Sequence, residues 1–290
     1  MFKAMGSPCE LRLVGDDPSL LQDASRWAQD ETLRFERKYS RFKEDSLVGR
    51  INARAGLSDA LDLDEEAMAL FGYADQCYRV SEGAFDVTSG CLRRVWFAGR
   101  KTLPPQEELQ TMLKLVDWPA VEWARGEARL PVKGMEIDFG GIVKEYAADA
   151  LIEGLKRRGV TSALVNLGGD IRCAGEHPDG GAWPIGVQHP FESGPIATLL
   201  LTDKAIASSG GYERYLEIEG RRYSHIIDPR TGWPVDALAA VSVVSDQAVV
   251  SGSLATIAIV LGERGLEFLS ASGATWFAVD RTGKTFGTHI

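Results

Sequence analysis

The chain has 290 residues, of which 44% are hydrophobic, and this suffices for a well-buried core in one large domain or two closely packed ones. Its formal net charge is −9, and the lack of a basic run argues against a nucleic-acid-binding protein. No apolar run approaches the roughly 18 residues of a membrane span, so the sequence does not predict an integral membrane protein.

The amino-terminal half is expected to be mainly helical. In chain order, the patterns predict a strand, a helix, a polar loop or short helix, a second helix, a Gly/Ser-rich turn segment and a helix opened by prolines, over residues 9–15, 18–38, 39–52, 64–80, 81–92 and 103–116. The first residues show neither the hydrophobic region nor the cleavage site of a signal peptide. We therefore expect a cytoplasmic protein, an expectation that a removed leader would change.

The second half alternates between helix and sheet. Its patterns predict a helix, a meander of strands, two further helices and a final hairpin, over 141–158, 162–175, 183–190, 195–210, 213–229, 240–245, 250–261, 265–272 and 274–288. No regular strand–helix–strand succession is present. The sequence thus indicates a single α+β domain over 1–290, with a largely antiparallel sheet core and flanking helices.

Four cysteines are scattered through the chain without CxxC spacing. Cys9, Cys77, Cys91 and Cys173 are therefore expected to be reduced, packed thiols rather than parts of a disulfide or a zinc site.

The segment EIDFGGIVKEY (136–146) contains the tripeptide Asp-Phe-Gly that holds magnesium in protein kinases. The Gly-rich loop, strand lysine and His-Arg-Asp loop of a kinase are missing, which excludes that class. Two interpretations of Asp138 remain. It caps the following helix while Lys144 is solvated, or the helix N-terminus and Lys144 together bind an anion.

Three further polar turns follow strand-like runs: VNLGGDI (165–171), SSGGYERY (208–215) and SHIIDPRTGWP (224–234). Paired glycines allow a flat or phosphorylated ligand to approach the backbone, yet Gly-Gly-Asp and Asp-Pro-x-x-Gly are also ordinary turn sequences. Taken alone, His225 is more often a structural residue than a catalyst.

Together and in this order, the segments resemble the ApbE-like family of FAD:protein FMN transferases. The resemblance covers about residues 3 to 285 and includes MGSP (5–8), YSRFKEDSLVGRIN (39–52), GAFDVTSGCL (83–92), IDFGGIVKEYAADAL (137–151) and SGSLATIAIVLG (251–262). It implies an enzyme that transfers FMN from FAD to a Thr or Ser of a partner protein through a phosphoester bond, releasing AMP. Mg²⁺ would lie near the FAD pyrophosphate. The implied partner is an acceptor flavoprotein subunit with a Ser/Thr-rich flavinylation segment.

The same resemblance assigns roles to individual positions. Phe42 stands where many relatives have a tyrosine and would keep its stacking face. His225 and Asp228 are the two candidates for a general base, and the sequence does not decide between them. The metal would be held at Gly141, at position 252 and at Thr256. The residues implied to bind FAD are Met5, Phe42, Ala84, Phe85, Asp86, Asp138, Lys144 and Ile227.

Two departures from the family pattern stand out: one removes an expected metal ligand, and the other is a milder change. Gly252 replaces the aspartate of the usual Ala-Asp-x-x-x-Thr motif, and Lys-Glu-Tyr at 144–146 stands where many relatives have Lys-Gly-Tyr. Because Mg²⁺ prefers at least one carboxylate, a weakened metal site is expected. The alternative functions are therefore an FAD-binding protein without turnover and an FAD pyrophosphatase that makes FMN and AMP. On sequence alone, Gly252→Asp is expected to tighten Mg²⁺ binding.

Overall fold

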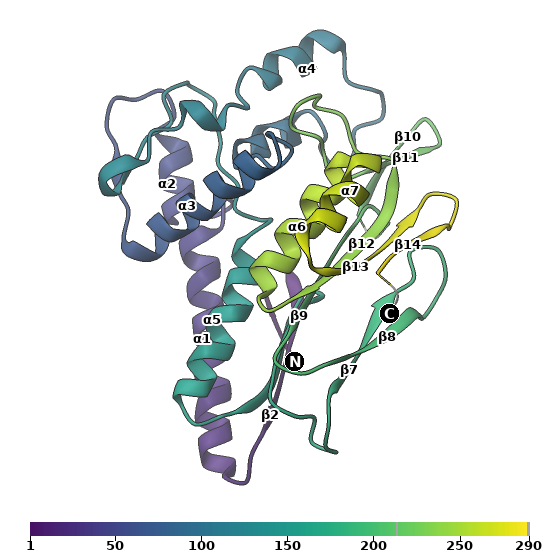
Figure 1. Ribbon diagram of the computed structural model, residues 1–290. Helices are drawn as coiled ribbons and strands as arrows, with labels where there is room; N and C mark the ends of the chain where they lie inside the picture. The colour runs from purple at the N-terminus through teal and green to yellow at the C-terminus, as the bar shows by residue number, and fades with distance from the viewer. Residues whose placement is uncertain (213, 289–290) are drawn as a thin grey trace.

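The computed structural model describes residues 1–212 and 214–288 and contains a central eight-stranded sheet, in the order β1-β2-β5-β6-β9-β12-β13-β14 (Figure 1). Every pair of neighbouring strands in it is antiparallel. This confirms the α+β class with a largely antiparallel core. The strands are β1 (Phe2–Ala4), β2 (Ser7–Val14), β5 (Ser162–Leu167), β6 (Asp170–Ala174), β9 (Ala205–Gly210), β12 (Leu238–Ser245), β13 (Thr275–Asp280) and β14 (Thr285–Gly287).

The remaining strands form two-stranded ribbons outside the central sheet. They pair as β3 (Leu61–Asp62) with β4 (Glu127–Ala128), β7 (Trp183–Gln188) with β8 (Pro195–Leu201), and β10 (Tyr215–Ile218) with β11 (Arg221–Ser224). The prediction of one continuous meander from 162 to 229 is therefore wrong, because β9 returns to the central sheet beside β6 while the two ribbons leave it. Position 213, the first of the predicted segment 213–229, lies outside the described residues.

The predicted helices are confirmed within a few residues at each end. Asp17 and Asp64 cap α1 and α3, accepting hydrogen bonds from the backbone at Ser19 and Ala67. The segment 81–92, expected as a turn, continues into a 3-10 helix. The helices are α1 (Pro18–Tyr39), α2 (Leu47–Ala53), α3 (Glu65–Val80), α4 (Gln106–Leu113), α5 (Val143–Arg157), α6 (Ala248–Leu261) and α7 (Glu263–Ser272), with 3-10 helices at Val87–Arg94, Trp118–Ala120 and Ala124–Gly126.

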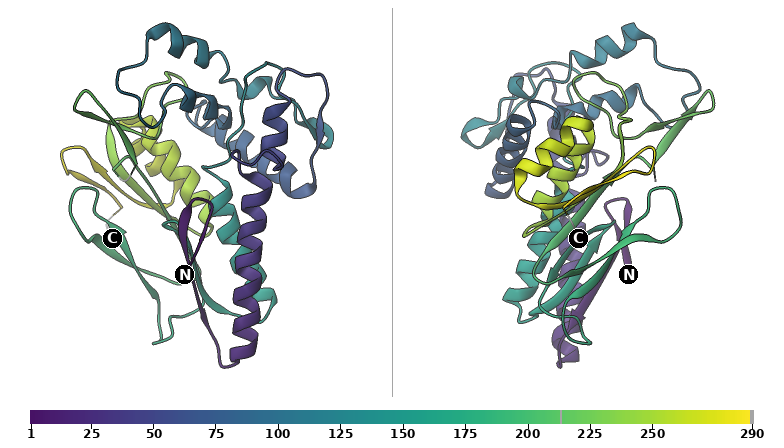
Figure 2. Two further views of the ribbon diagram at one scale, coloured as in Figure 1. Left: turned by 180° about the vertical axis from the view of Figure 1, so that it is seen from behind. Right: turned by 45° about the vertical axis from the view of Figure 1, so that its right-hand side comes forward.

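Both faces of the central sheet are covered, and the alternation of strand side chains explains how (Figure 2). On β5, Ala163 and Val165 belong to the main core with α1 and α5, whereas Leu164 packs with the β7–β8 ribbon. Trp183 of that ribbon is 1% exposed against this second face. The alternating apolar side chains of β7 and β8 thus form a second hydrophobic core on the other face of the sheet.

Helices α5 and α6 are held together by a side chain of one and the backbone of the other. Asp149 on α5 accepts hydrogen bonds from the amides of Ala248 and Val249, at 2.8 and 2.9 Å. Because α6 has no side-chain cap of its own at Gln247, this carboxylate satisfies two free amides at its start. The contact fixes the two helices that form the inner wall of the site.

The four cysteines are all buried and free, as expected. None of the helices in the described ranges is long and apolar enough to cross a membrane.

Candidate functional site

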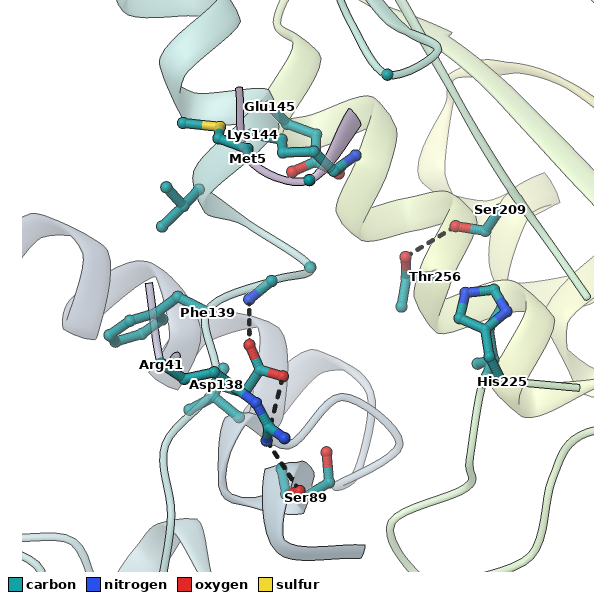
Figure 3. A pocket seen from close by; sticks show the side chains of 18 of the residues that line it. Met5, Arg41, Ser89, Asp138, Phe139, Lys144, Glu145, Ser209, His225 and Thr256 are labelled. Carbon is teal, nitrogen blue, oxygen red and sulfur yellow. Dashed lines mark hydrogen bonds and ion pairs between the residues drawn. The ribbon is translucent and has the colours of Figure 1, made fainter. Parts of the chain in front are cut away.

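A cavity of about 710 Å³ lies where the ends of α1, α5 and α6 meet the central sheet (Figure 3). This volume is in the range of roughly 300–1,000 Å³ that is usual for ligand sites. Its walls come from eight stretches of chain, so the tertiary fold alone assembles it. These stretches are represented by Met5, Tyr39, Phe85, Phe139, Gly168, Ser209, His225 and Thr256.

Most residues selected from the sequence meet at this cavity, although the sequence spreads them over most of the chain. Two do not line it, namely Asp228 and Gly252. The selected residues that do are Met5, Phe42, Ala84, Phe85, Asp86, Asp138, Gly141, Lys144, His225, Ile227 and Thr256.

Asp138 shapes the loop that leads into α5 but does not cap the helix. The helix begins at Val143, and Asp138 instead accepts a hydrogen bond from the amide of Gly140 at 2.8 Å. Its other carboxylate oxygen lies 3.7 Å from both Arg41 and Arg93. The capping interpretation is therefore wrong. Asp138 holds two arginines at the wall of the cavity.

Basic side chains line the cavity of this acidic protein, and sequence reasoning missed the arginines among them. Arg41 contacts Glu136 at 2.6 Å and the carbonyl of Gly90 at 3.0 Å, while its buried Nε has no hydrogen-bond partner in the described part of the chain. Its guanidinium lies 4.9 Å from the ring centre of Phe42, which is 81% exposed. Together with Arg93, Arg214 and Lys144, Arg41 makes the cavity suitable for an anion.

Asp86 lines the cavity, yet its carboxylate is occupied by its own segment. One oxygen accepts hydrogen bonds from the amide and hydroxyl of Thr88, and the other accepts from the amide of Trp118 at 3.4 Å. Burial raises the pKa of this carboxyl, and these hydrogen bonds oppose the rise. If Asp86 binds FAD, as the resemblance implies, the ligand has to share carboxylate oxygens that already accept these hydrogen bonds.

Lys144 lies between two buried carboxylates at the inner end of the cavity. It forms an ion pair with Asp170, and its Nζ lies 3.8 Å from Oε1 of Glu145. Burial alone would lower the pKa of Lys144, but the charges of Glu145 and Asp170 raise it above its ordinary value. Lys144 therefore stays protonated at neutral pH despite its burial. Neither carboxylate was selected from the sequence, although both stand inside the quoted motifs.

His225 and Asp228 are separated by the structure. The ring Nδ1 of His225 lies 2.9 Å from the carbonyl oxygen of Arg214. Asp228 instead accepts three hydrogen bonds from Arg230, at 2.8 to 2.9 Å, within the Pro-Arg-Thr-Gly-Trp turn. Of the two candidates for a general base, only His225 reaches the cavity.

The three positions selected for a metal also differ. Gly141 lines the cavity, and Thr256 does so with its hydroxyl 2.9 Å from that of Ser209. Gly252 is buried in α6, where a Cβ atom would lie 2.6 Å from Cγ and 2.9 Å from Oε1 of Glu145. No room is left at position 252 unless Glu145 moves.

Within residues 1–212 and 214–288, no group of three or more His, Cys, Asp or Glu side chains is arranged to hold a metal ion. A cation here would depend on few protein ligands and on oxygens of a bound substrate, as Mg²⁺ sites with phosphates commonly do. The donors available fit such an ion. Glu145 Oε2 is buried without a hydrogen-bond partner among the described residues, and the Thr256 hydroxyl lines the same cavity.

Comparisons with known proteins agree over nearly the whole chain. The model of the ApbE family matches residues 5–277. The FAD:protein FMN transferase of Klebsiella pneumoniae is 32% identical over 90% of this chain and 82% of that protein. A crystal structure of the ApbE protein from Thermotoga maritima superposes with a TM-score of 0.90 at 28% identity, over 99% of this chain and 96% of that one. The flavinyl transferase ApbE of Pseudomonas stutzeri gives 0.87 at 29% identity, over 99% and 93%. The family match includes every stretch that lines the cavity.

Proposed function

The chain belongs to the ApbE family, and from this premise and the cavity we propose that it transfers the FMN part of FAD to a serine or threonine of a partner protein. The family and the enzyme class expected from the sequence, a transferase, are both confirmed. The donor, the acceptor group and the second product, AMP, belong to the proposal.

One observation carries it: the Lys144 cation and His225, whose Nε2 has no hydrogen-bond partner among residues 1–212 and 214–288, line the same cavity. Lys144, Arg41 and Arg93 supply positive charge for a pyrophosphate. The exposed ring of Phe42 offers a stacking surface for one of the two ring systems of FAD. His225 supplies a place for the proton that the acceptor hydroxyl loses.

The reaction proceeds by attack of the acceptor oxygen on the phosphorus of the FMN half. A new P–O bond forms, the bond to the bridging pyrophosphate oxygen breaks, and AMP leaves with that oxygen. The hydroxyl proton passes to Nε2 of His225. Lys144 and the arginines offset the charge that develops on the phosphate oxygens.

The chain's own residues define where a metal would act. Gly141 through its carbonyl and Thr256 through its hydroxyl would hold Mg²⁺ beside the pyrophosphate. When bound, Mg²⁺ polarises the phosphoryl oxygens and stabilises the leaving phosphate. Position 252 contributes no side chain to this site.

The partner is expected to be a flavoprotein subunit that presents a flexible Ser/Thr-rich segment, because the attacking hydroxyl has to reach a phosphorus inside the cavity. Nothing in the described residues indicates its identity, so a general acceptor fragment is the appropriate probe.

The test is mass spectrometry of such a fragment after incubation with the protein and FAD, with and without Mg²⁺. A metal-dependent mass gain of one FMN on the fragment supports the transferase. Free FMN and AMP without an adduct would assign a pyrophosphatase instead. FAD that stays bound and intact would assign a flavin-binding protein.

A further inference from the structure

We propose that Glu145, on α5, supplies the carboxylate ligand for the divalent cation, in place of a side chain at position 252 on α6. The proposal rests on the function proposed above and names a ligand for its metal. Three independent features of the structure support it: the space around Gly252, the unpaired oxygen of Glu145, and the position of Thr256.

The first feature is the direct contact between the two helices. A Cβ atom on Gly252 would lie 2.6 Å from Cγ, 3.0 Å from Cδ and 2.9 Å from Oε1 of Glu145. These distances are shorter than van der Waals contact, so the glycine is what makes room for the glutamate. The side chain of Glu145 therefore occupies the space into which any side chain at position 252 would extend.

The second feature is an unsatisfied acceptor. Glu145 is 5% exposed, and its Oε2 has no hydrogen-bond partner within the described chain. Lys144 forms no hydrogen bond with it, because this lysine is bound to Asp170 and its Nζ lies 3.8 Å from the other oxygen, Oε1. A buried carboxylate oxygen without a partner is rare in proteins, and Glu145 lines the cavity, so a bound cation would supply the missing partner.

The third feature is the position of the second ligand. Gly252 and Thr256 are one turn apart on the same face of α6, and Thr256 faces the cavity. Glu145 packs on Gly252, so it lies about one turn of α6 from Thr256, and both residues line the same cavity (Figure 3). Carboxylate, hydroxyl and substrate phosphate oxygens are the hard ligands that Mg²⁺ prefers. The two departures of this sequence from its family thus compensate each other.

The test measures binding of Mn²⁺, a paramagnetic substitute for Mg²⁺, to the full chain with FAD present, from the loss of the free-ion EPR signal. Glu145→Gln keeps the shape of the side chain and removes its charge. We expect this substitution to lower the affinity for Mn²⁺ by roughly 10- to 100-fold, which is the usual loss when a group that supports a metal is removed. Glu153→Gln, an exposed glutamate on the same helix, is the matched control and should bind Mn²⁺ as the wild type does.

A second readout separates a ligand from a merely structural residue. In EDTA, Glu145→Gln should bind FAD at least as tightly as the wild type, followed by flavin fluorescence, because one negative charge near the pyrophosphate is gone. The exchange variant Glu145→Gly with Gly252→Asp should regain Mn²⁺ affinity. Gly252→Asp alone should instead lower the melting temperature, because Glu145 already occupies the space. We therefore no longer expect this single change to tighten Mg²⁺ binding.

Unchanged Mn²⁺ affinity in Glu145→Gln would overturn the assignment, as would a wild type that binds no Mn²⁺ with FAD. Labelling of the acceptor fragment is assayed separately. If Mn²⁺ depends on Glu145 but no acceptor is labelled, the ligand assignment stands and the transferase proposal fails. If the acceptor is labelled and Glu145→Gln binds Mn²⁺ as tightly as the wild type does, the transferase proposal stands and the ligand assignment fails.

Discussion

His225 presents Nε2 to the cavity as a proton acceptor, because its Nδ1 lies 2.9 Å from the carbonyl oxygen of Arg214. A carbonyl oxygen can only accept, so Nδ1 carries the hydrogen and the neutral ring has its lone pair on Nε2. A backbone carbonyl thus selects the tautomer that a general base requires.

Replacing His225 should slow transfer without abolishing FAD binding. We expect His225→Gln to lower the single-turnover rate of acceptor labelling by about 10²- to 10⁴-fold, the usual contribution of a positioned base. Rapid-quench mass spectrometry gives the rate, and flavin fluorescence gives FAD affinity. His189→Gln, in the β7–β8 connection outside the cavity, is the matched control. A His225→Gln rate close to that of the wild type would remove the histidine from the chemistry.

The pH dependence of transfer should reflect the environment of the same histidine. Burial lowers the pKa of His225 from its ordinary value of 6.5, and the charges of Arg93, Arg214 and Lys144 lower it further, against the hydrogen bond to the Arg214 carbonyl. Because the base acts when neutral, kcat/KM should stay high below pH 6.5 and fall only on further acidification. His225→Gln should lack this acid limb. A midpoint above pH 6.5 would contradict this prediction.

The packing of α1 against α5 leaves no space at Gly154. A Cβ atom there would lie 2.0 Å from Cη2 of Trp27, whose ring also stacks under Arg158 at 3.6 Å. Gly154→Ala should therefore lower the free energy of unfolding by about 1–3 kcal/mol through overpacking. Urea denaturation measures this.

The control for this substitution is Gly72→Ala on α3, where a new methyl group meets nothing within 4 Å. Since alanine favours helix over glycine, this variant should gain about 0.5–1 kcal/mol. Equal stability of Gly154→Ala and the wild type would show that Trp27 moves aside freely.

Glu66 on α3 should make the stability of the folded protein sensitive to acid. Burial alone would raise the pKa of Glu66, but hydrogen bonds from Arg34, Lys38 and Tyr39 lower it from 4.5 to about 2. The folded state therefore binds this proton more weakly than the unfolded chain. The resulting stability is present above pH 4.5 and is lost as the pH falls toward 2.

Glu66→Gln should remove this dependence. The difference in unfolding free energy between wild type and variant, from urea titrations, should be constant above about pH 5 and shrink between pH 4.5 and 2. Solvent screening keeps it small, on the order of 1 kcal/mol. A difference of the same size at pH 2.5 and pH 7 would contradict the role of ionised Glu66.

The sequence by itself determined the helices, the α+β class and the family. Helices such as α1 and α3 follow from apolar residues on one face and from Asp17 and Asp64 at their starts, and these are signals carried within a few turns of chain. The family could be identified from glycine-rich motifs, because both the motifs and their order can be read directly from the sequence. Most residues selected from those motifs line the cavity for the same reason.

Only the tertiary structure decided which partners these side chains have. Asp138 holds Arg41 and Arg93 rather than capping α5, and Asp228 bonds to Arg230 while His225 reaches the cavity. Glu145 and Gly252 are far apart in sequence and touch because α5 packs on α6. These tertiary contacts depend on how whole helices and strands pack. A local sequence pattern therefore does not reveal which side chain fills the space between two of them.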